Sequence, residues 1–502
     1  MAKWNKVKNI GELKASGYQP VSIREEMRRN LIAVIKKKEK VFPGIIGYDD
    51  TVIPAIENAI ISGQDIILLG ERGQAKSKIM RLLVNLLDEE IPVIKGCEIN
   101  DNPFAPVCKW CRNKLVEEGD STEIAWLSRQ ERYGEKLATP DIAISDLIGD
   151  VDPIKVAEGR YLSDELTVHY GLIPRTNRGI FCINELPDLA EKVQVGLFNL
   201  MEERDIQIRG YNIRLPLDIF LVASANPEDY TNRGRIITPL KDRYGAQIRT
   251  HYPATIEDEL SIMEAERQQF SRNEFEHYLP QYMKEIIAEV THLARQSPDI
   301  NQRSGVSVRV SIANYETIIS NAIRRAVTLG EKLAVPRISD LPYIRSSTIG
   351  KVELESLDMI GNIELKNLDA SGQAGLESQD TSGKMELENL EETRDTEEKV
   401  IGDLIKRAVL NVFNRYYNLD RLEEIAEQFS GGFSVEVSDT MSAESYMRTV
   451  KEIAGLTEVI QVESDSERPE TIASAVEFIL EGLHVNKKLN KTRSEGNTVY
   501  RR

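Results

Sequence analysis

The sequence predicts an α/β protein in which a mostly parallel sheet is covered by helices on both faces and is followed by an all-helical region. Short apolar runs typical of buried strands occur in QDIILLG, GIFCI and DIFLVASAN. Segments with helical spacing separate these runs, which favours parallel pairing of the strands. From about residue 255 the pattern becomes helical. At 502 residues the chain is too long for one hydrophobic core, so we expect several domains.

The first predicted strand is followed by a glycine-rich turn and a helix. Helices are predicted over residues 24–40 and over TVIPAIENAIISG, and the strand QDIILLG comes next. KSKIMRLLVNLLDEE then has the spacing of an amphipathic helix. Strand, glycine-rich turn and helix in this order are the context that a phosphate-binding loop requires.

Two more strands follow a segment of mixed character. Residues 96–178 combine polar loops with short apolar pieces. Strands are predicted at 179–183 and 218–226, with a helix at 190–203 between them. ERDIQIRGYNIRLP alternates around RGYN and predicts a hairpin.

The C-terminal half is predicted to be helical, with an acidic interruption. Helical patterns fill residues 255–345, and residues 349–400 form an acidic, solvated linker. Within the linker, KVELESLD, NIELKNLD and KMELENLE share one spacing, which indicates either a weak internal repeat or low-complexity drift. Helical periodicity resumes at residue 401 and predicts a small helical domain. The basic tail NKKLNKTRSEGNTVYRR is expected to be frayed.

Composition excludes several classes of function. The net charge of −17 argues against nucleic-acid binding as the main role, because neutralising phosphates requires clustered Lys and Arg. No apolar stretch is long enough for a membrane span, and the N-terminus lacks the apolar region of a secretory signal. Four cysteines in a chain of this length suit a reducing compartment, so we expect a cytoplasmic protein.

GERGQAKS at residues 70–77 nearly matches the phosphate-binding loop Gly-x-x-x-x-Gly-Lys-Ser. Lys76 is expected to reach the β- and γ-phosphates of a nucleotide, and the Ser77 hydroxyl to ligate Mg²⁺. Ala75 replaces the second glycine, a change that costs little if φ there is negative. The alternative is a chance turn. The loop residues expected to surround the phosphates are Gly70, Glu71, Arg72, Gly73, Gln74 and Ala75.

GIFCINEL places an acidic residue at the end of the second predicted strand. Glu185 is expected to polarise a water molecule for attack on the γ-phosphate. Asn184 stands where a metal-holding aspartate is usual, and its amide brings no charge to Mg²⁺. We therefore expect slower hydrolysis and retained nucleotide binding.

The ordered motifs GERGQAKS, GIFCINEL, SAN, KDRYG and GVSVR resemble those of AAA+ ATPases, specifically the clade of MoxR-type ATPases and the ATPase subunit of magnesium chelatase. The resemblance covers roughly residues 20–345. It implies a P-loop αβα core. Together with the composition it divides the chain into an N-terminal extension (1–20), an αβ core (21–254), a helical lid (255–348), the acidic linker (349–400) and a helical C-terminal domain (401–502).

The resemblance also implies roles for residues outside the phosphate loop. Asn226 matches the first sensor, a polar group between the catalytic carboxylate and the γ-phosphate. Arg243 matches the arginine finger that acts on a neighbouring subunit's nucleotide, and Arg309 matches the second sensor. Two other candidates for the finger are Arg233 and Arg235. Ile46 and Gly47 in IIGYDD match the segment that contacts adenine.

A finger that acts between subunits implies a ring, with six subunits as the expected number. The clade commonly works with a separate partner that carries a von Willebrand A domain, and no such domain is visible here. The client protein cannot be named from the sequence.

Three cysteines lie close together in GCEINDNPFAPVCKWC. Cys97, Cys108 and Cys111 have a spacing compatible with zinc, but a tetrahedral site needs a fourth ligand, which Asp101 or a distant histidine would have to supply. The alternative is three ordinary thiols in a loop. Cys182 lies in a predicted buried strand and is expected to be a core residue.

The sequence leaves three functions, of which we predict the first. The first is an ATPase ring that remodels or activates a partner protein. The second is the motor subunit of a magnesium chelatase, which drives Mg²⁺ insertion into a porphyrin. The third is a nucleotide-binding scaffold with little turnover, motivated by Ala75 and Asn184. Activation of sigma-54 transcription is disfavoured because a GAFTGA-like loop and a basic DNA-binding helix are absent.

Overall fold

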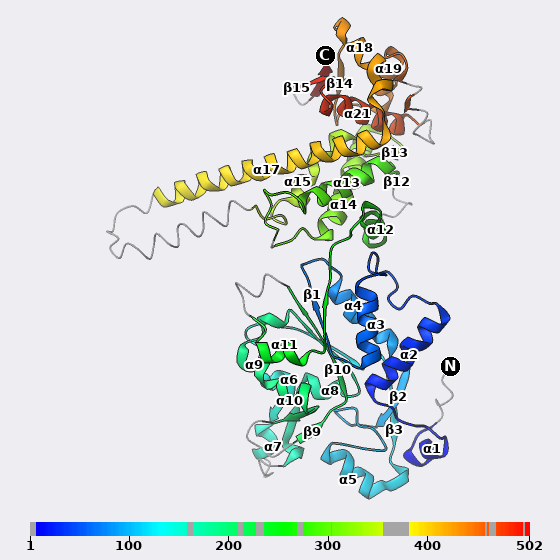
Figure 1. Cartoon of the computed structure of the whole chain (residues 1–502), viewed down its shortest axis with the longest axis vertical. Coiled ribbons are helices and arrows are strands. Elements are labelled where there is room, and N and C mark those ends of the chain that lie inside the picture. The colour runs from blue at the N-terminus through cyan, green and yellow to red at the C-terminus, as the bar shows by residue number, and fades with distance from the viewer. Residues whose placement is uncertain are drawn as a thin grey trace. The chain divides into compact units, whose positions relative to one another are not determined.

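The computed structural model describes residues 7–157, 164–208, 214–226, 235–268, 275–302, 304–354, 381–456, 459–460, 468–494 and 497–502. It divides into two compact units, Met1–His251 and Tyr252–Arg502. Each unit has its own hydrophobic core, and each is described separately (Figure 1).

The first unit is built on a five-stranded parallel sheet. Its strand order is β11-β1-β10-β7-β4. Every neighbouring pair is parallel, with Ile66 opposite both Val222 and Ala246, and Gly179 opposite Ile219. The predicted parallel sheet is therefore confirmed. The strands are β1 (Ile66–Leu69), β4 (Tyr133–Leu137), β7 (Gly179–Asn184), β10 (Ile219–Ala225) and β11 (Ala246–Arg249).

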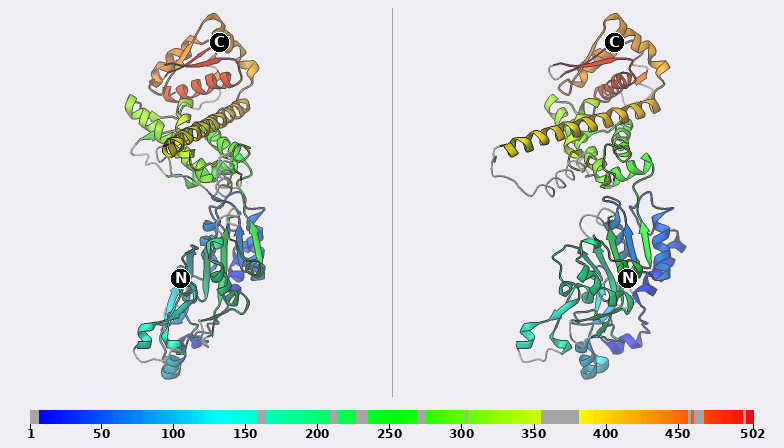
Figure 2. Two further views of the ribbon diagram at one scale, coloured as in Figure 1. Left: turned by 90° about the vertical axis from the view of Figure 1, so that its left-hand side faces the viewer. Right: turned by 60° about the vertical axis from the view of Figure 1, so that its left-hand side comes forward.

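Alternate side chains of the central strands enter two different cores. Ile66 and Leu68 pack with Ile180 and Cys182 on one face, whereas Ile67 packs on the other. This period of two explains why the strands read as continuous apolar runs, since both faces are buried. The first face is covered by α2 (Ile23–Lys37), α3 (Val52–Ser62) and α4 (Lys76–Leu82). The second is covered by α6 (Ile144–Ile148), α9 (Glu191–Gly196), α10 (Phe198–Glu202) and α11 (Thr238–Arg243) (Figure 2).

Local signals explain where these helices begin and end. Ser22 caps α2, and its hydroxyl and the Glu25 carboxylate form a capping box. Gly63 ends α3 in the left-handed conformation. Two predicted helices are shorter than expected: α4 passes into the 3-10 helix η1 (Leu83–Leu86), and the helix predicted at 190–203 is interrupted at Leu197 between α9 and α10.

The mixed segment before β7 contains small antiparallel pairs. β2 (Glu90–Ile94) pairs with β3 (Ile124–Ser128), and β5 (Gly149–Val151) pairs with β6 (Val168–Tyr170). The other short elements of the first unit are α1 (Ile10–Ala15), α5 (Lys109–Glu118), η2 (Gly119–Ser121), α7 (Pro153–Ala157), η3 (Glu165–Thr167), α8 (Leu172–Arg175) and, after β7, η4 (Leu186–Asp188). The predicted hairpin is present as β8 (Asp205–Gln207) and β9 (Arg214–Pro216), and residues 209–213 lie outside the described residues.

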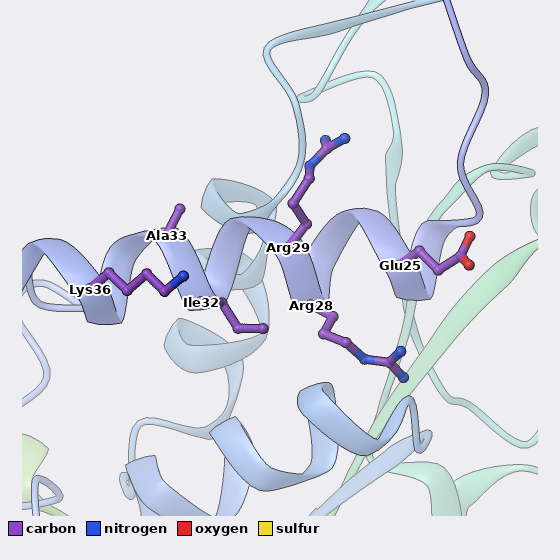
Figure 3. Close-up of a pocket in the computed structure, with 6 residues that line it drawn as sticks. All are labelled: Glu25, Arg28, Arg29, Ile32, Ala33 and Lys36. Atoms are coloured by element: carbon purple, nitrogen blue, oxygen red, sulfur yellow. The ribbon is translucent and has the colours of Figure 1, made fainter.

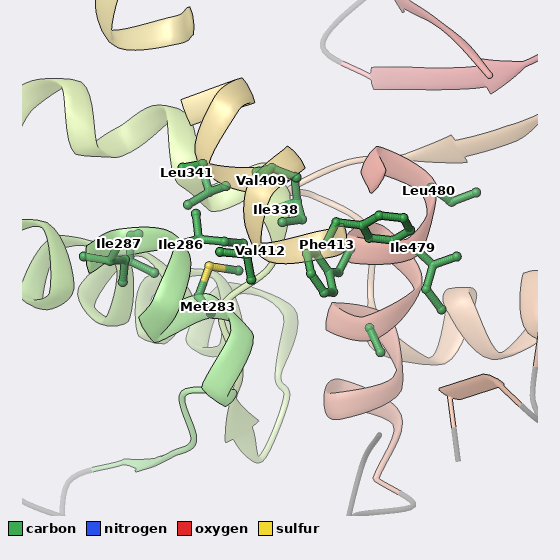
Figure 4. Close-up of a cluster of buried hydrophobic side chains, with 14 of the residues drawn as sticks. Met283, Ile286, Ile287, Ile338, Leu341, Val409, Val412, Phe413, Ile479 and Leu480 are labelled. Atoms are coloured by element: carbon green, nitrogen blue, oxygen red, sulfur yellow. The ribbon is translucent and has the colours of Figure 1, made fainter. Parts of the chain in front are cut away.

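The second unit has one continuous core that joins the predicted lid to the C-terminal helices. Met283, Ile286 and Ile287 of α13 (Gln281–Ala294) pack with Val409, Val412 and Phe413 of α17 (Thr381–Tyr416) and with Ile479 and Leu480 of α21 (Pro469–Val485) (Figure 4). Other helices here are α12 (Ile256–Glu266), α14 (Val308–Leu329), η6 (Ile338–Ile344), α15 (Arg345–Thr348), η7 (Leu419–Leu422), α18 (Glu423–Gln428), η8 (Phe429–Gly431) and α19 (Ala443–Glu452). A short parallel pair joins β12 (Glu276–His277) and β13 (Leu333–Ala334).

The C-terminal region differs from the expected helical domain because it also contains a sheet. β14 (Val435–Val437), β16 (Asn497–Arg501) and β15 (Asn490–Ser494) form three antiparallel strands. The expectation of a frayed tail is therefore wrong. Tyr500 is buried and donates a hydrogen bond to the Glu481 carboxylate, which holds the last strand in place.

The predicted linker at 349–400 is partly helical. α17 begins at Thr381 and continues without interruption past residue 400, so helical periodicity starts earlier than the apolar stripe suggested. Residues 355–380, which include the end of KVELESLD and all of NIELKNLD, lie outside the described residues, whereas KMELENLE lies within α17. Among the helices that the structure describes, none has the length and apolar character needed to cross a membrane.

Candidate active site

The segment between β1 and α4 has the geometry of a phosphate-binding loop. Gly73 has φ +78, a left-handed conformation that favours glycine. A Cβ atom at Gly70 would lie 2.0 Å from the Thr250 hydroxyl oxygen and 2.2 Å from the Gln74 side-chain oxygen, so no side chain fits there. The loop is thus packed tightly against the edge of the sheet, with its helix beginning at Lys76.

Ala75 adopts a positive φ of 56°, so the expectation of a negative angle is wrong. A left-handed conformation costs a residue with a Cβ atom roughly 1–2 kcal/mol. The methyl group is half-buried and packs against the core on the α2–α4 face. The substitution therefore preserves the glycine-like backbone path of the loop at the cost of local strain.

Lys76 is buried, and its ammonium group is held by three oxygen atoms. It donates to the carbonyl oxygens of Gly70 at 2.5 Å and Glu71 at 2.8 Å, and to Asn226 Oδ1 at 2.6 Å. The positive charge is thereby fixed beneath the loop, and its contact with Asn226 links the loop to the end of β10.

Glu185 and Asn226 follow the carboxyl ends of neighbouring strands β7 and β10. Asn226 Nδ2 donates to Glu185 Oε2 at 2.7 Å, and the Glu185 amide donates to Ser224 Oγ at 3.2 Å. Hydrogen bonds therefore run from the Lys76 ammonium through the Asn226 side chain to the Glu185 carboxylate. Glu185 also has φ 54, and strained backbone of this kind clusters at functional sites.

The Asn184 side chain lies beside the Ser77 hydroxyl group, at the start of α4. Its Oδ1 accepts hydrogen bonds from Ser77 Oγ at 3.4 Å and Ser224 Oγ at 3.3 Å. Its Nδ2 donates to Glu135 Oε1 at 2.5 Å. The amide is thus oriented with its oxygen toward Ser77 and its nitrogen toward a carboxylate.

Glu135 is a member of this cluster that the sequence did not identify. It lies on β4, directly next to β7, where it pairs in register with Cys182. Arg81 donates two hydrogen bonds to its carboxylate at 2.9 and 3.0 Å, which lower the pKa of the Glu135 carboxyl group. A negative charge is therefore present one strand away from the position where Asn184 lacks one.

The segment that contains Ile46 and Gly47 is joined to the loop by the next residue. The Tyr48 hydroxyl donates to the Gln74 carbonyl at 3.1 Å and to the His251 carbonyl at 2.7 Å. Its burial raises the pKa of Tyr48 to about 12, so it remains a donor at neutral pH. Gly47 has φ +77, and Ile46 is half-buried.

Comparison with curated proteins gives relatives of one kind. The chain is 27% identical over 364 residues to the magnesium-chelatase subunit ChlI of Synechocystis, covering 66% of this chain and 95% of that protein. It is 30% identical over 241 residues to the chloroplastic ChlI-2 subunit of Arabidopsis thaliana, covering 46% and 53%. A ChlI homolog of Methanocaldococcus jannaschii is 28% identical over 229 residues, which cover 44% of this chain and 58% of that protein. These similarities support the AAA+ ATPase clade to which the motifs point.

Coverage varies among these relatives. The chain spans nearly all of the Synechocystis subunit but little more than half of the Arabidopsis and Methanocaldococcus proteins. No family model matches the chain. A solved complex of magnesium-chelatase subunits BchI and BchD matches at TM-score 0.34 and 18% identity, covering 64% of this chain and 98% of that chain, a likeness too small to support an argument.

Two of the arginines that the AAA+ resemblance singled out, Arg243 and Arg235, make other contacts within the first unit. Arg243 ends α11, where its guanidinium contacts the Glu202 carboxylate at 2.6 Å and lies over the Phe198 ring. Arg235 is mostly exposed and contacts Glu191 at 3.3 Å. Arg309 is exposed at the start of α14 in the second unit, and Arg233 lies outside the described residues.

Two other features of the first unit are separate from this cluster. Cys182 is fully buried in β7, which confirms that it is a core residue. A shallow hollow along α2 is lined by residues of that helix alone and shares none with the phosphate-binding loop (Figure 3): Glu25, Arg28, Arg29, Ile32, Ala33 and Lys36.

Proposed function

We propose that the chain is an ATP-hydrolysing AAA+ motor that remodels or activates a partner protein. The observation that supports this proposal is a series of hydrogen bonds from Lys76 through Asn226 to Glu185. These residues lie at the carboxyl ends of parallel strands, beside a phosphate-binding loop. Ligands of open parallel sheets bind in this position.

Each residue of the series has a distinct role in this proposal. Lys76 binds the β- and γ-phosphates and offsets their negative charge. Glu185 accepts a proton from the attacking water, and Asn226 orients the Glu185 carboxylate while contacting the γ-phosphate region. The loop amides between Gly70 and Ala75 bind the phosphate oxygens.

The residues near Ser77 fit a hydrated magnesium ion. Mg²⁺ prefers oxygen ligands and usually keeps several waters while it is bound to few protein groups. The Ser77 hydroxyl is the direct ligand that the chain offers, and the Asn184 oxygen and Glu135 carboxylate are placed to accept hydrogen bonds from coordinated waters. Bound Mg²⁺ would supply charge neutralisation at the β- and γ-phosphates.

We also propose that the chain assembles into a ring in which Arg243 is the arginine finger. An arginine finger acts on the nucleotide of a neighbouring subunit, so Arg243 would have to exchange its contact with Glu202 for that nucleotide. We further propose six subunits per ring and a separate partner that carries a von Willebrand A domain.

Two alternative functions keep specific observations in their favour. Relatives named as magnesium-chelatase subunits favour a motor that drives Mg²⁺ insertion into a porphyrin. Strained Ala75 and uncharged Asn184 favour a nucleotide-binding scaffold with little turnover. Stimulation of ATP turnover by a porphyrin-binding partner would favour the first alternative, and absence of turnover with intact binding would favour the second.

The proposal is tested with Lys76→Ala, assayed for ATP binding by calorimetry and for phosphate release. Loss of the charge-assisted contacts of Lys76 is expected to weaken ATP binding roughly 10- to 100-fold and to remove turnover. Lys37→Ala, which removes an exposed lysine of α2, is the matched control and is expected to behave like the wild type. Equal ATP affinity in Lys76→Ala and wild type would contradict the proposed site.

Asn184→Asp tests the proposed magnesium position. The new carboxylate at position 184 would lie within hydrogen-bonding distance of the Glu135 carboxylate, and the two negative charges would repel each other. Binding of Mg²⁺ would relieve this repulsion, so the variant should bind the ion more tightly. The Mg²⁺ concentration for half-maximal ATP turnover is expected to fall several-fold, and turnover at low Mg²⁺ to rise. A titration of turnover against Mg²⁺ at saturating ATP measures both effects.

Two further variants make this titration decisive. Glu135→Gln is expected to raise the Mg²⁺ requirement, and the double variant with Asn184→Asp is expected to lie between the two single variants. Asn199→Asp makes the same chemical change at an exposed position of α10 and should leave the titration unchanged. An unshifted midpoint in both Asn184→Asp and Glu135→Gln would show that these positions do not act on the ion.

A further inference from the structure

Four potential metal ligands converge at a distance in sequence from the phosphate-binding loop. Cys97 and Asp101 lie in the segment after β2, and Cys108 and Cys111 lie at the start of α5. One ligand atom from each residue lies within 4.8 Å of the ligand atoms of the other three. Asp101 therefore supplies a fourth potential ligand atom beside the three cysteine sulfur atoms.

The Asp101 carboxylate is fully buried but only half satisfied. Its Oδ2 accepts hydrogen bonds from the backbone amides of Val107 at 3.1 Å and Cys108 at 2.9 Å. Its Oδ1 is buried without any hydrogen-bond partner. An uncompensated buried carboxylate oxygen is costly unless a cation or a donor meets it. The three sulfur atoms beside it cannot fill that role without a metal ion, because they are weak donors.

Two of the three sulfur atoms accept hydrogen bonds from backbone amides. Cys108 caps the N-terminus of α5, and its sulfur accepts a hydrogen bond from the Cys111 amide at 3.3 Å. The Cys97 sulfur accepts from the Asp101 amide at 3.4 Å. Cysteine binds a metal ion as the thiolate, so binding of the ion would release the thiol protons. Ile94 and Ile99 pack around the cluster and limit access of water.

We propose that Cys97, Asp101, Cys108 and Cys111 bind one structural zinc ion in a tetrahedral site. Sulfur-rich tetrahedral sites with four protein ligands are typical of structural Zn²⁺. Ligand atoms bound to zinc at about 2.3 Å lie roughly 3.8 Å apart in a tetrahedron, so the observed grouping needs only a small contraction. Oδ1 of Asp101 is the carboxylate oxygen left available for the ion, since Oδ2 is occupied by two amides.

The ion would fix α5, which in turn holds a segment before β6. The Lys109 amide donates to Glu165 at 2.5 Å, and its ammonium contacts Asp164 at 2.8 Å. Arg112 contacts Glu165 at 3.1 Å. A zinc ion that joins the β2–α5 segment to α5 would therefore also position the β5–β6 pair. This role is independent of nucleotide binding and hydrolysis.

Metal analysis of the full-length chain tests the proposal. The protein is expressed with added zinc, purified under reducing conditions without affinity metals, and analysed by mass spectrometry. About one zinc per chain is expected. Replacement by Co²⁺ is expected to give the visible bands of a tetrahedral site and the ultraviolet absorption of thiolate ligation. Trp110, which lies between Cys108 and Cys111, is expected to change its fluorescence when a chelator removes the ion.

Matched variants separate metal binding from general misfolding. Cys111→Ser and Asp101→Asn are expected to lose most of the bound zinc, and Asp101→Asn tests the ligand without removing a thiol. Cys182→Ser removes the remaining cysteine and should keep the full zinc content. Less than about 0.2 zinc per chain, together with no cobalt bands in the wild type, would overturn the proposal. Iron in place of zinc, or a Cys108–Cys111 disulfide in the purified protein, would also overturn it.

Discussion

Glu185→Gln is expected to abolish ATP turnover while leaving nucleotide binding intact. Glutamine keeps the shape of the side chain and its contact with Asn226, but it cannot accept the proton of an attacking water. Loss of a general base typically lowers the rate about 10²- to 10⁴-fold. Phosphate release in the steady state measures turnover, and calorimetric titration with ATP measures affinity, which is expected to remain within a few-fold of the wild type.

The paired assay also distinguishes the motor from the scaffold. Glu203→Gln, at an exposed position after α10, makes the same chemical change away from the site and should retain full turnover. The assay is made on the assembled chain with its partner present, since the proposed arginine finger from a neighbouring subunit would contribute to the rate. Equal phosphate release by wild type and Glu185→Gln would refute hydrolysis at this site.

Glu26→Leu is expected to destabilise the first unit by about 3–5 kcal/mol. Arg132 and Glu26 form two hydrogen bonds of 2.6 Å, and both side chains are almost fully buried. Removing Glu26 leaves the guanidinium charge uncompensated and deprives the Asp88 amide of its acceptor. Arg132 also donates to the Arg178 carbonyl, so the pair joins the starts of β4 and β7.

Urea unfolding followed by tryptophan fluorescence measures this loss. The three tryptophans of the chain all lie at or before residue 126, so the signal reports on the first unit. The double variant Glu26→Leu/Arg132→Met is expected to regain most of the stability, because the buried charge is removed. Lys14→Met, which breaks the exposed pair with Asp120, should cost at most about 1 kcal/mol. A similarly small cost for Glu26→Leu would contradict the expected role of burial.

Most of the sheet could be predicted because its central strands are buried on both faces. β1, β7 and β10 appear in the sequence as short apolar runs, and the positions of Lys76, Glu185 and Asn226 follow from where these runs end. Because each of the three residues follows the carboxyl end of a parallel strand, the order of motifs predicts that they lie at one edge of the sheet. Their hydrogen bonds to one another required the register of the strands.

β4 could not be predicted, and Glu135 was missed with it. Tyr133–Leu137 lies at the edge of the sheet and has the sequence YGEKL, which lacks an apolar run because its side chains are half-buried or exposed. Only parallel pairing with β7 places Glu135 beside Asn184. Glu135 joins the site through its contact with a residue of the neighbouring strand, and the sequence of its own segment does not indicate this contact.

Backbone conformation was the other source of error. The sign of φ at Ala75 is imposed by the turn from β1 into α4, which the surrounding core holds in place, and it contradicts the local preference of alanine. The C-terminal tail reads as polar and basic, yet it forms β15 and β16 because Tyr500 is buried near Glu481.

The chain alone determines the αβ core, the order of its motifs and its AAA+ resemblance, because these depend on local periodicity and on residue types at short spacing. Tertiary structure decides which groups meet. It brings Asp101 to the three cysteines, Glu135 to Asn184 and the helices of the lid to α17 and α21. These contacts join residues far apart in sequence, and their distances depend on strand register and packing rather than on local preference.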